Sequence, residues 1–136
     1  MKKIIITGGL GYIGMELSKI YSGKSKYYDI TVIDNVFFSE RVSQLKRWGI
    51  KFVQVDITQK NKMKEVLDAA DIIYHLAGIT DVGTTIEDKN ISRDKEVRNV
   101  GVEGTKNIIN FSPEYSKIVF PSTHVIYEGL KEVKKN

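Results

Sequence analysis

The segment "KKIIITGGLGYIGMEL", residues 2–17, decides how this chain is interpreted. An apolar run at residues 4–6 ends directly in the glycine-rich stretch "TGGLGYIG", residues 7–14. Apolar residues at helical spacing then follow, among them Ile13, Leu17 and Ile20. A short apolar run closed by glycine is typical of a buried strand, and this spacing is typical of an amphipathic helix. The segment therefore predicts a strand, a glycine loop and a helix in direct succession.

The rest of the chain repeats this alternation of strand and helix. We expect strands at residues 2–8, 28–35, 50–56, 71–78 and 117–122, and helices at 11–23, 39–49, 58–70 and 93–111. Ser39 and Thr58 are expected to cap their helices, Gly49 to end the second helix, and Ile109 to belong to the apolar face of the last one. This order predicts an α/β domain over residues 1–136, a doubly wound parallel sheet of about five strands with helices on both faces.

The glycines Gly8, Gly11 and Gly14 have the spacing expected of a loop that binds a pyrophosphate. Gly8 would permit the tight turn, Gly11 would let the backbone approach phosphate, and Gly14 would let the helix pack on the strand. The N-terminus of the following helix, which includes Tyr12 and Ile13, supplies free N–H groups and a partial positive charge. These five residues therefore form the predicted phosphate-binding part of a cofactor site.

Asp34 stands at the end of the second predicted strand, twenty residues after Gly14, and Asn35 follows it. A carboxylate in that place accepts hydrogen bonds from the adenosine ribose hydroxyls and repels a 2′-phosphate. The loop and Asp34 together therefore predict NAD, rather than NADP, as the cofactor. In the alternative interpretation the glycines only form turns and Asp34 only caps a strand.

Composition restricts the class of protein further. With 41% hydrophobic and 28% charged residues and no long apolar run, the chain is typical of a soluble globular protein without a membrane span. The absence of cysteine excludes disulfides and thiolate chemistry and fits a cytoplasmic protein. His75 and His124 lie far apart without evident carboxylate partners, so we expect no metal site. The net charge of +4 comes from dispersed lysines, which indicates a solvated surface rather than a nucleic-acid interface.

Further blocks resemble the extended short-chain dehydrogenase/reductase family, which includes the NAD-dependent sugar epimerases and dehydratases. They follow "TGGLGYIG" and "VIDN" in the family order: "VDIT" at 55–58, "HLAG" at 75–78, "GVEGT" at 101–105 and "PSTHVIY" at 121–127. The resemblance implies a Rossmann-type sheet, NAD as the cofactor and hydride transfer at a nucleotide-sugar hydroxyl. It also implies contacts to adenine from Asp56 and Ile57, and a segment beside the cofactor made of Leu76, Ala77 and Gly78.

The same resemblance implies that Thr123 is the catalytic hydroxyl that hydrogen-bonds the reacting sugar, although it also suits a plain strand end. His124 stands where the dehydratase branch carries aspartate, and we interpret it as part of an exposed loop. Two departures from the family pattern stand out. The family's asparagine in Asn-Val-x-Gly-Thr is Gly101 here, with Asn99 on another helix face, and Glu128 displaces the glycine after Val-Tyr.

The stretch "YEGLK", residues 127–131, has the Tyr-x-x-x-Lys form of the family's catalytic pair. That pair requires a helix, in which residues i and i+4 share a face about 6 Å apart along the axis. Tyr127 instead corresponds to the tyrosine at the end of the fifth strand, and an extended segment would separate it from Lys131 by about 13 Å. Gly129 between them weakens a helix by roughly 1 kcal/mol relative to alanine. We therefore expect Tyr127 to pack at the rim of the site and the true catalytic pair to be missing.

These observations predict the N-terminal, NAD-binding part of a nucleotide-sugar epimerase/dehydratase, incomplete relative to the family and inactive alone, with the C-terminal substrate domain absent. The partner of the parent enzyme would be a nucleotide-sugar, with no nucleic acid and no membrane. The alternative is a stand-alone regulatory module that binds NAD without catalysis, and a weaker one is nucleic-acid binding through the basic tail. We expect the fifth strand to be an open sheet edge, which favours a homodimer or marginal solubility.

Overall fold

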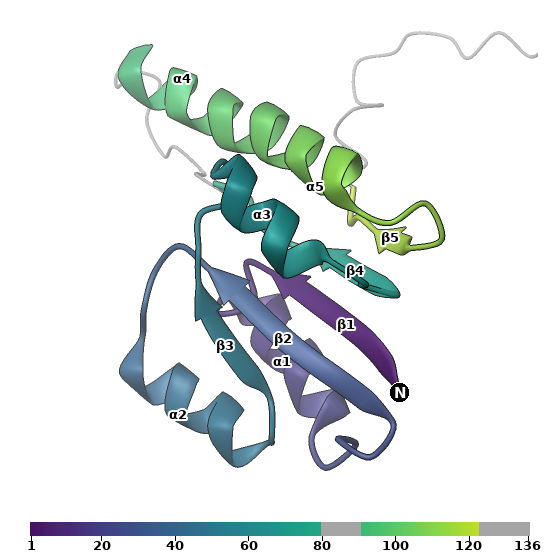
Figure 1. The fold of residues 1–136 in the computed structure, drawn as a ribbon. Coiled ribbons are helices and arrows are strands. Elements are labelled where there is room, and N and C mark those ends of the chain that lie inside the picture. Colours follow the sequence, from purple (N-terminus) through teal and green to yellow (C-terminus); the bar gives the residue numbers. More distant parts are fainter. Residues whose placement is uncertain (80–90, 123–136) are drawn as a thin grey trace, which may run out of the picture.

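The computed structural model describes residues 1–79 and 91–122 and confirms the alternation of strands and helices there (Figure 1). In chain order the elements are β1 (Lys2–Thr7), α1 (Tyr12–Tyr21), β2 (Tyr28–Asp34), α2 (Ser39–Arg47), β3 (Lys51–Gln54), α3 (Lys60–Leu67), β4 (Ile72–His75), α4 (Ile91–Arg98), a π-helical segment η1 (Asn99–Gly104), α5 (Thr105–Phe111) and β5 (Lys117–Val119).

The strands form one parallel sheet in the order β3-β2-β1-β4-β5. β1 is central, and its Ile4 is level with Ile30 of β2 on one side and Ile72 of β4 on the other. The chain leaves β1 toward β2 and later returns toward β4, so the order reverses beside β1. Open sheets of this kind bind ligands outside the carboxyl ends of the strands at such a reversal. The predicted α/β, doubly wound fold is confirmed.

Helices cover both faces of the sheet, and β1 buries side chains on each face. Ile4 and Ile6 pack with Leu45 of α2 and partly buried residues of α1. Ile5 points the other way and packs with Met63 of α3 and Ile108 of α5. Figure 1 shows α1 behind the strands and α3 in front of them. A parallel strand buried on both faces reads as a continuous apolar run, which is the pattern "IIIT" in β1.

Both predicted N-caps were wrong. Ser39 is the first residue of α2, whose N-cap is Phe38, and α3 begins at Lys60 with Gln59 as its N-cap. Among the described residues neither cap position has a side-chain hydrogen bond. The hydroxyl and N–H of Thr58 instead donate to Asp56 Oδ1, each at 2.8 Å, so Thr58 closes a turn before the helix.

The predicted long helix is one continuous rod, α4–η1–α5, with π-type hydrogen bonding in its middle (Figure 1). Ile108 is fully buried, but the predicted core position Ile109 is 60% exposed. At Gly104 an added Cβ would lie 2.3 Å from Ile57 Cδ1, so this glycine lets the rod approach the loop between β3 and α3.

β5 lies at one edge of the sheet, as predicted, and β3 lies at the other. An exposed edge presents unpaired backbone groups that can pair with another chain. The homodimer expected from this edge stays a prediction.

Gly49 ends α2 as predicted. Its φ is +74°, its N–H donates to the Lys46 carbonyl, and the Ile50 N–H donates to the Leu45 carbonyl, both at 3.0 Å. This pair of bonds is a Schellman motif, and Leu45 and Ile50 share one core cluster, as that motif favours. The turn delivers the chain from α2 into β3 and so fixes the outer part of the sheet.

We expect Gly49→Ala to lower the free energy of unfolding by about 1 kcal/mol, because a side chain at positive φ is strained even where space exists. Space does exist, since the nearest atom to an added Cβ would be Ser25 Cβ at 3.8 Å. Urea denaturation would measure the change. Gly49→Asn should lose less, because asparagine tolerates this conformation. A Gly49→Ala variant as stable as the parent would contradict the strained turn.

Candidate functional site

The loop after β1 turns on Gly8, which has a φ of +62°. An added Cβ would lie 2.7 Å from both Cα and N of Ala77, just beyond β4. A side chain at position 8 is therefore excluded by conformation and by the neighbouring backbone. Gly11 closes the turn by donating its N–H to the Gly8 carbonyl at 3.0 Å. The predicted turn role of Gly8 is confirmed.

Gly14 is buried, but its close neighbour is the loop rather than the strand. An added Cβ would lie 2.4 Å from Gly9 Cα and 2.6 Å from Gly9 O. The predicted helix-on-strand contact is therefore corrected to a contact between α1 and the loop. Gly9 is not part of the motif spacing, but it also leaves no room for a side chain. An added Cβ would lie 2.5 Å from Val32 Cγ1. The loop is thus held tightly between α1 and the sheet.

This packing points the N-terminus of α1 into the space beyond the strands. The helix begins at Tyr12, and its first backbone hydrogen bond is donated by the Met15 N–H to the Gly11 carbonyl, at 3.0 Å. The N–H groups of Tyr12, Ile13 and Gly14 precede the first complete turn and have no acceptor within the helix. Together with the partial positive charge of the helix end, they favour an anion.

Asp34, at the end of β2, is oriented by backbone donors. Its Oδ2 accepts the Leu10 N–H at 3.0 Å, and its Oδ1 accepts the Val36 N–H at 3.2 Å. The carboxylate therefore ties the glycine loop to β2, a role that the sequence analysis did not include. Each carboxylate oxygen has a further lone pair, so Asp34 can still accept from a ligand hydroxyl.

A cavity of about 660 Å³ opens beyond the carboxyl ends of β1, β2 and β4. Every predicted cofactor residue lines it: Gly8, Gly11, Tyr12, Ile13, Gly14, Asp34, Asn35, Asp56, Ile57, Leu76, Ala77 and Gly78. These residues come from four separate sequence blocks, and the fold brings all four to one cleft. That they contact a cofactor stays a prediction. Thr123, His124, Tyr127 and Lys131 lie outside the described residues.

The cleft has further lining residues that the sequence analysis did not single out as binding residues: Leu10, Val36, Phe38, Arg41, Val55, His75, Ile79, Val100, Gly101, Thr105, Phe120 and Pro121. Several belong to quoted blocks, such as His75 in "HLAG" and Thr105 in "GVEGT", so the blocks carried a signal for them. Phe38 and Arg41 belong to no motif. They reach the cleft through the placement of α2, which no sequence pattern predicts.

His75 forms a buried polar chain across the floor of the cleft. It is 2% exposed, and its Nδ1 lies 2.8 Å from Thr7 Oγ1 while its Nε2 lies 2.9 Å from Thr105 Oγ1. The Ala77 N–H donates to Thr7 Oγ1 at 3.1 Å, so the chain also fixes the backbone after β4. Burial lowers the pKa of His75 below its ordinary value, which favours a neutral imidazole.

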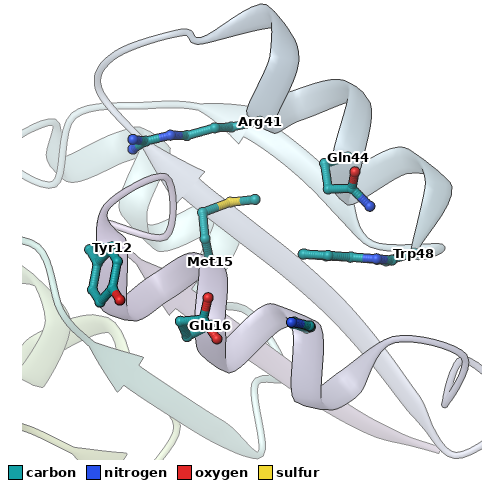
Figure 2. Close-up of a pocket in the computed structure, with 7 residues that line it drawn as sticks. Tyr12, Met15, Glu16, Arg41, Gln44 and Trp48 are labelled. Carbon is teal, nitrogen blue, oxygen red and sulfur yellow. The ribbon is translucent and has the colours of Figure 1, made fainter.

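A second cavity, of about 540 Å³, lies between α1 and α2 (Figure 2). Its lining residues are Tyr12, Met15, Glu16, Lys19, Arg41, Gln44 and Trp48. Tyr12 and Arg41 line both cavities. Figure 2 shows Arg41 extending from α2 toward the N-terminus of α1.

Over residues 1–79 and 91–122, no group of three or more His, Cys, Asp or Glu side chains is placed to hold a metal ion. In the same ranges, no helix has the length and apolar character needed to cross a bilayer. The cytoplasmic location expected from the sequence stays a prediction.

The lowered pKa of His75 predicts a pH-dependent stability. The imidazole of His75 binds a proton more readily in the unfolded chain than in the folded one. The free energy of unfolding should therefore fall as the pH drops below about 6.5 toward the lowered pKa of His75. Urea midpoints between pH 7.5 and pH 5.5 would show this slope. His75→Asn should flatten it and His124→Gln should not. A slope lost with His124 instead, or no slope at all, would contradict the assignment to His75.

The chain is similar to known proteins in sequence and in fold. The model of the 3-beta hydroxysteroid dehydrogenase/isomerase family matches residues 5–134. A UDP-N-acetyl-alpha-D-glucosaminuronate decarboxylase of Bacillus cytotoxicus is 31% identical over 128 residues, covering 93% of this chain and 38% of that protein. A UDP-glucose 4-epimerase of Mycoplasma genitalium is 28% identical over 130 residues, covering 92% of this chain and 37% of that protein. The chain thus spans less than two fifths of the length of either relative.

Solved structures share the fold. A UDP-glucose-4-epimerase from Stenotrophomonas maltophila with bound NAD and formylated UDP-arabinopyranose has a TM-score of 0.73 at 19% identity, covering 99% of this chain and 41% of that one. An L-threonine dehydrogenase from Clostridium difficile has a TM-score of 0.71 at 26% identity, covering 90% and 37%. The resemblance stated from the motifs is therefore confirmed. The chain belongs to the 3-beta hydroxysteroid dehydrogenase/isomerase family, within the extended short-chain dehydrogenases/reductases that include the NAD-dependent epimerases and dehydratases.

Proposed function

We propose that this chain binds NAD in the cleft beyond β1, β2 and β4, as the cofactor-binding part of a nucleotide-sugar epimerase/dehydratase. The observation that carries the proposal is the convergence of all twelve predicted residues on one cavity at the reversal of strand order. Ligand sites of this fold class lie at that reversal. The cavity, about 660 Å³, also falls within the range typical of cofactor sites.

The residues of the cleft suit the parts of a dinucleotide. Gly11 is exposed, and the atom nearest to an added Cβ would be the Gly8 carbonyl oxygen at 3.1 Å, so bare backbone faces the cleft. A pyrophosphate would rest there against the N–H groups of Tyr12 and Ile13. Asp34 would accept from the adenosine ribose hydroxyls, with Asn35 beside it, and Asp56 with Ile57 would border the adenine.

The nicotinamide half would extend toward Leu76, Ala77 and Gly78, over the polar floor made by Thr7, His75 and Thr105. Bound NAD supplies a hydride acceptor for oxidation of a sugar hydroxyl. This chain's own contribution is to orient the cofactor and hold the floor of the cleft in one hydrogen-bonded arrangement. Thr123 remains the proposed contact to the reacting hydroxyl.

The substrate class rests on the relatives. Two of them carry UDP-sugar names, and the structurally similar epimerase was solved with a UDP-sugar as well as NAD. A viral relative, 30% identical over 104 residues, is a 3 beta-hydroxysteroid dehydrogenase/Delta 5-->4-isomerase of Monkeypox virus. We favour a nucleotide-sugar for the parent enzyme, with no turnover by this chain alone.

A non-catalytic module that senses NAD is the second candidate, because the predicted residues that line the cleft serve cofactor binding alone. The reading frame of the gene separates the two. A frame that continues past Asn136 into a Tyr-x-x-x-Lys helix supports the enzyme, and a stop codon there supports the module. Both candidates require the same NAD site.

Calorimetric titration of the purified chain should show binding of NAD at least about tenfold tighter than binding of NADP, because Asp34 repels the 2′-phosphate. Asp34→Asn keeps an oxygen for the Leu10 N–H but removes the charge. It should weaken NAD binding by about tenfold and narrow the difference between the two cofactors.

The matched control is Asp29→Asn, at the opposite end of β2, where the carboxylate pairs with Lys51 at 2.8 Å on the surface. It should leave both affinities unchanged. Equal binding of NAD and NADP by the parent chain, or no binding of NAD, would contradict the proposal.

A further inference from the structure

The backbone of Leu10, in the middle of the glycine loop, is held from two sides. Its side chain is buried at 1% exposure, and its N–H donates to Asp34 Oδ2 at 3.0 Å. Its carbonyl accepts a hydrogen bond from Arg41 Nη1. Two side chains of opposite charge, Asp34 at the end of β2 and Arg41 on α2, therefore form hydrogen bonds with the N–H and the carbonyl of one residue. We name this arrangement of Asp34, Leu10 and Arg41 the Leu10 clamp.

The guanidinium of Arg41 is supported where it lies. Its carbon is 5.1 Å from the centre of the Phe38 ring, a distance at which a cation is attracted to the ring face. Phe38 is the N-cap of α2 and Arg41 follows three residues later, so the two lie on neighbouring positions of the helix surface. Figure 2 shows the Arg41 side chain extended from α2 toward the N-terminus of α1. The beginning of α2 is thereby connected to the beginning of α1.

The position of the Leu10 carbonyl gives this contact a consequence for anion binding. Leu10 precedes Gly11, the N-cap of α1, so the peptide between them helps to set the direction of the first N–H groups of the helix. Both Leu10 and Gly11 line the cleft. A free carbonyl oxygen there would present a partial negative charge to a phosphate. The Arg41 guanidinium covers that oxygen and adds a positive charge beside the helix end.

We propose that Arg41 is a positioning residue for the phosphate-binding loop, acting through the Leu10 carbonyl. The inference rests on the proposed NAD site and deepens it, because it assigns a function to a residue that belongs to no motif. Arg41 is fixed by Phe38, Asp34 supplies the opposing hydrogen bond, and the loop between them keeps the orientation that a pyrophosphate requires.

A rival role is direct recognition of a ribose phosphate. An arginine near the ribose end of such a site can accommodate the 2′-phosphate of NADP. That role predicts an effect on NADP alone and none on the ligand-free loop. The Leu10 clamp predicts an effect on the loop before any cofactor is added.

The test compares Arg41→Met and Arg41→Lys with the control Arg47→Met on the same helix. Arg47 bonds to Gln44 at 2.8 Å and lines neither cavity. Amide hydrogen exchange of Leu10 and Gly9 is measured without ligand, and the dissociation constants of NAD and NADP are measured by calorimetry. Circular dichroism and urea midpoints check that each variant is folded.

We expect Arg41→Met to speed loop amide exchange and to weaken NAD binding, each by about tenfold, the effect of losing one charge-assisted hydrogen bond. Arg41→Lys should recover part of both, since lysine keeps the charge with fewer donors. Arg47→Met should change neither. Unchanged loop exchange in Arg41→Met overturns the positioning role, and a loss confined to NADP assigns Arg41 to the ribose phosphate instead. If the parent chain binds no NAD, the proposed function fails, while faster loop exchange in Arg41→Met would still support the clamp.

Discussion

The contact on which the candidate site depends is the approach of bare backbone to bare backbone around the glycine loop. Gly8 lies against the backbone of Ala77, and Gly14 lies against Gly9, at distances where a single added carbon would overlap its neighbour. Only this packing lets α1 start directly beyond β1 and point its free N–H groups into the space where β1, β2 and β4 end. The glycines therefore set the position of a helix end, in addition to forming turns.

Around that contact, side chains are used chiefly to fix backbone. Asp34 and Arg41 hold Leu10, Thr7 holds the N–H of Ala77, and His75 joins β1 to α5 through two threonine hydroxyls. Among the described residues, every buried side-chain nitrogen or oxygen has a hydrogen-bond partner. A fully satisfied polar network is stiff, because each partner that moves leaves a buried group unpaired. The floor and one rim of the cleft are thus preorganised without a ligand.

The sequence was sufficient to predict the fold and the residues that line the cleft, because both depend on local patterns. A run such as "IIIT" indicates a strand buried on two faces. The glycine spacing indicates a loop whose backbone leaves no room for side chains. It was insufficient where a competing local bond or tertiary packing decides. Thr58 bonds to Asp56, two residues earlier, instead of capping α3, and Ile109 is exposed beside the buried Ile108. Arg41 enters the cleft only because α2 packs beside α1, and no spacing of residues indicates that.

The proposed NAD site requires that the N-terminus of α1 binds the pyrophosphate. The most direct measurement is a titration of the isotope-labelled chain with NAD, followed by amide NMR spectra. We expect the largest shifts at the N–H groups of Tyr12, Ile13 and Gly14, which have no acceptor within the helix. Shifts confined to Gln44 and Trp48, in the cavity between α1 and α2, would contradict it, and so would a spectrum that NAD leaves unchanged.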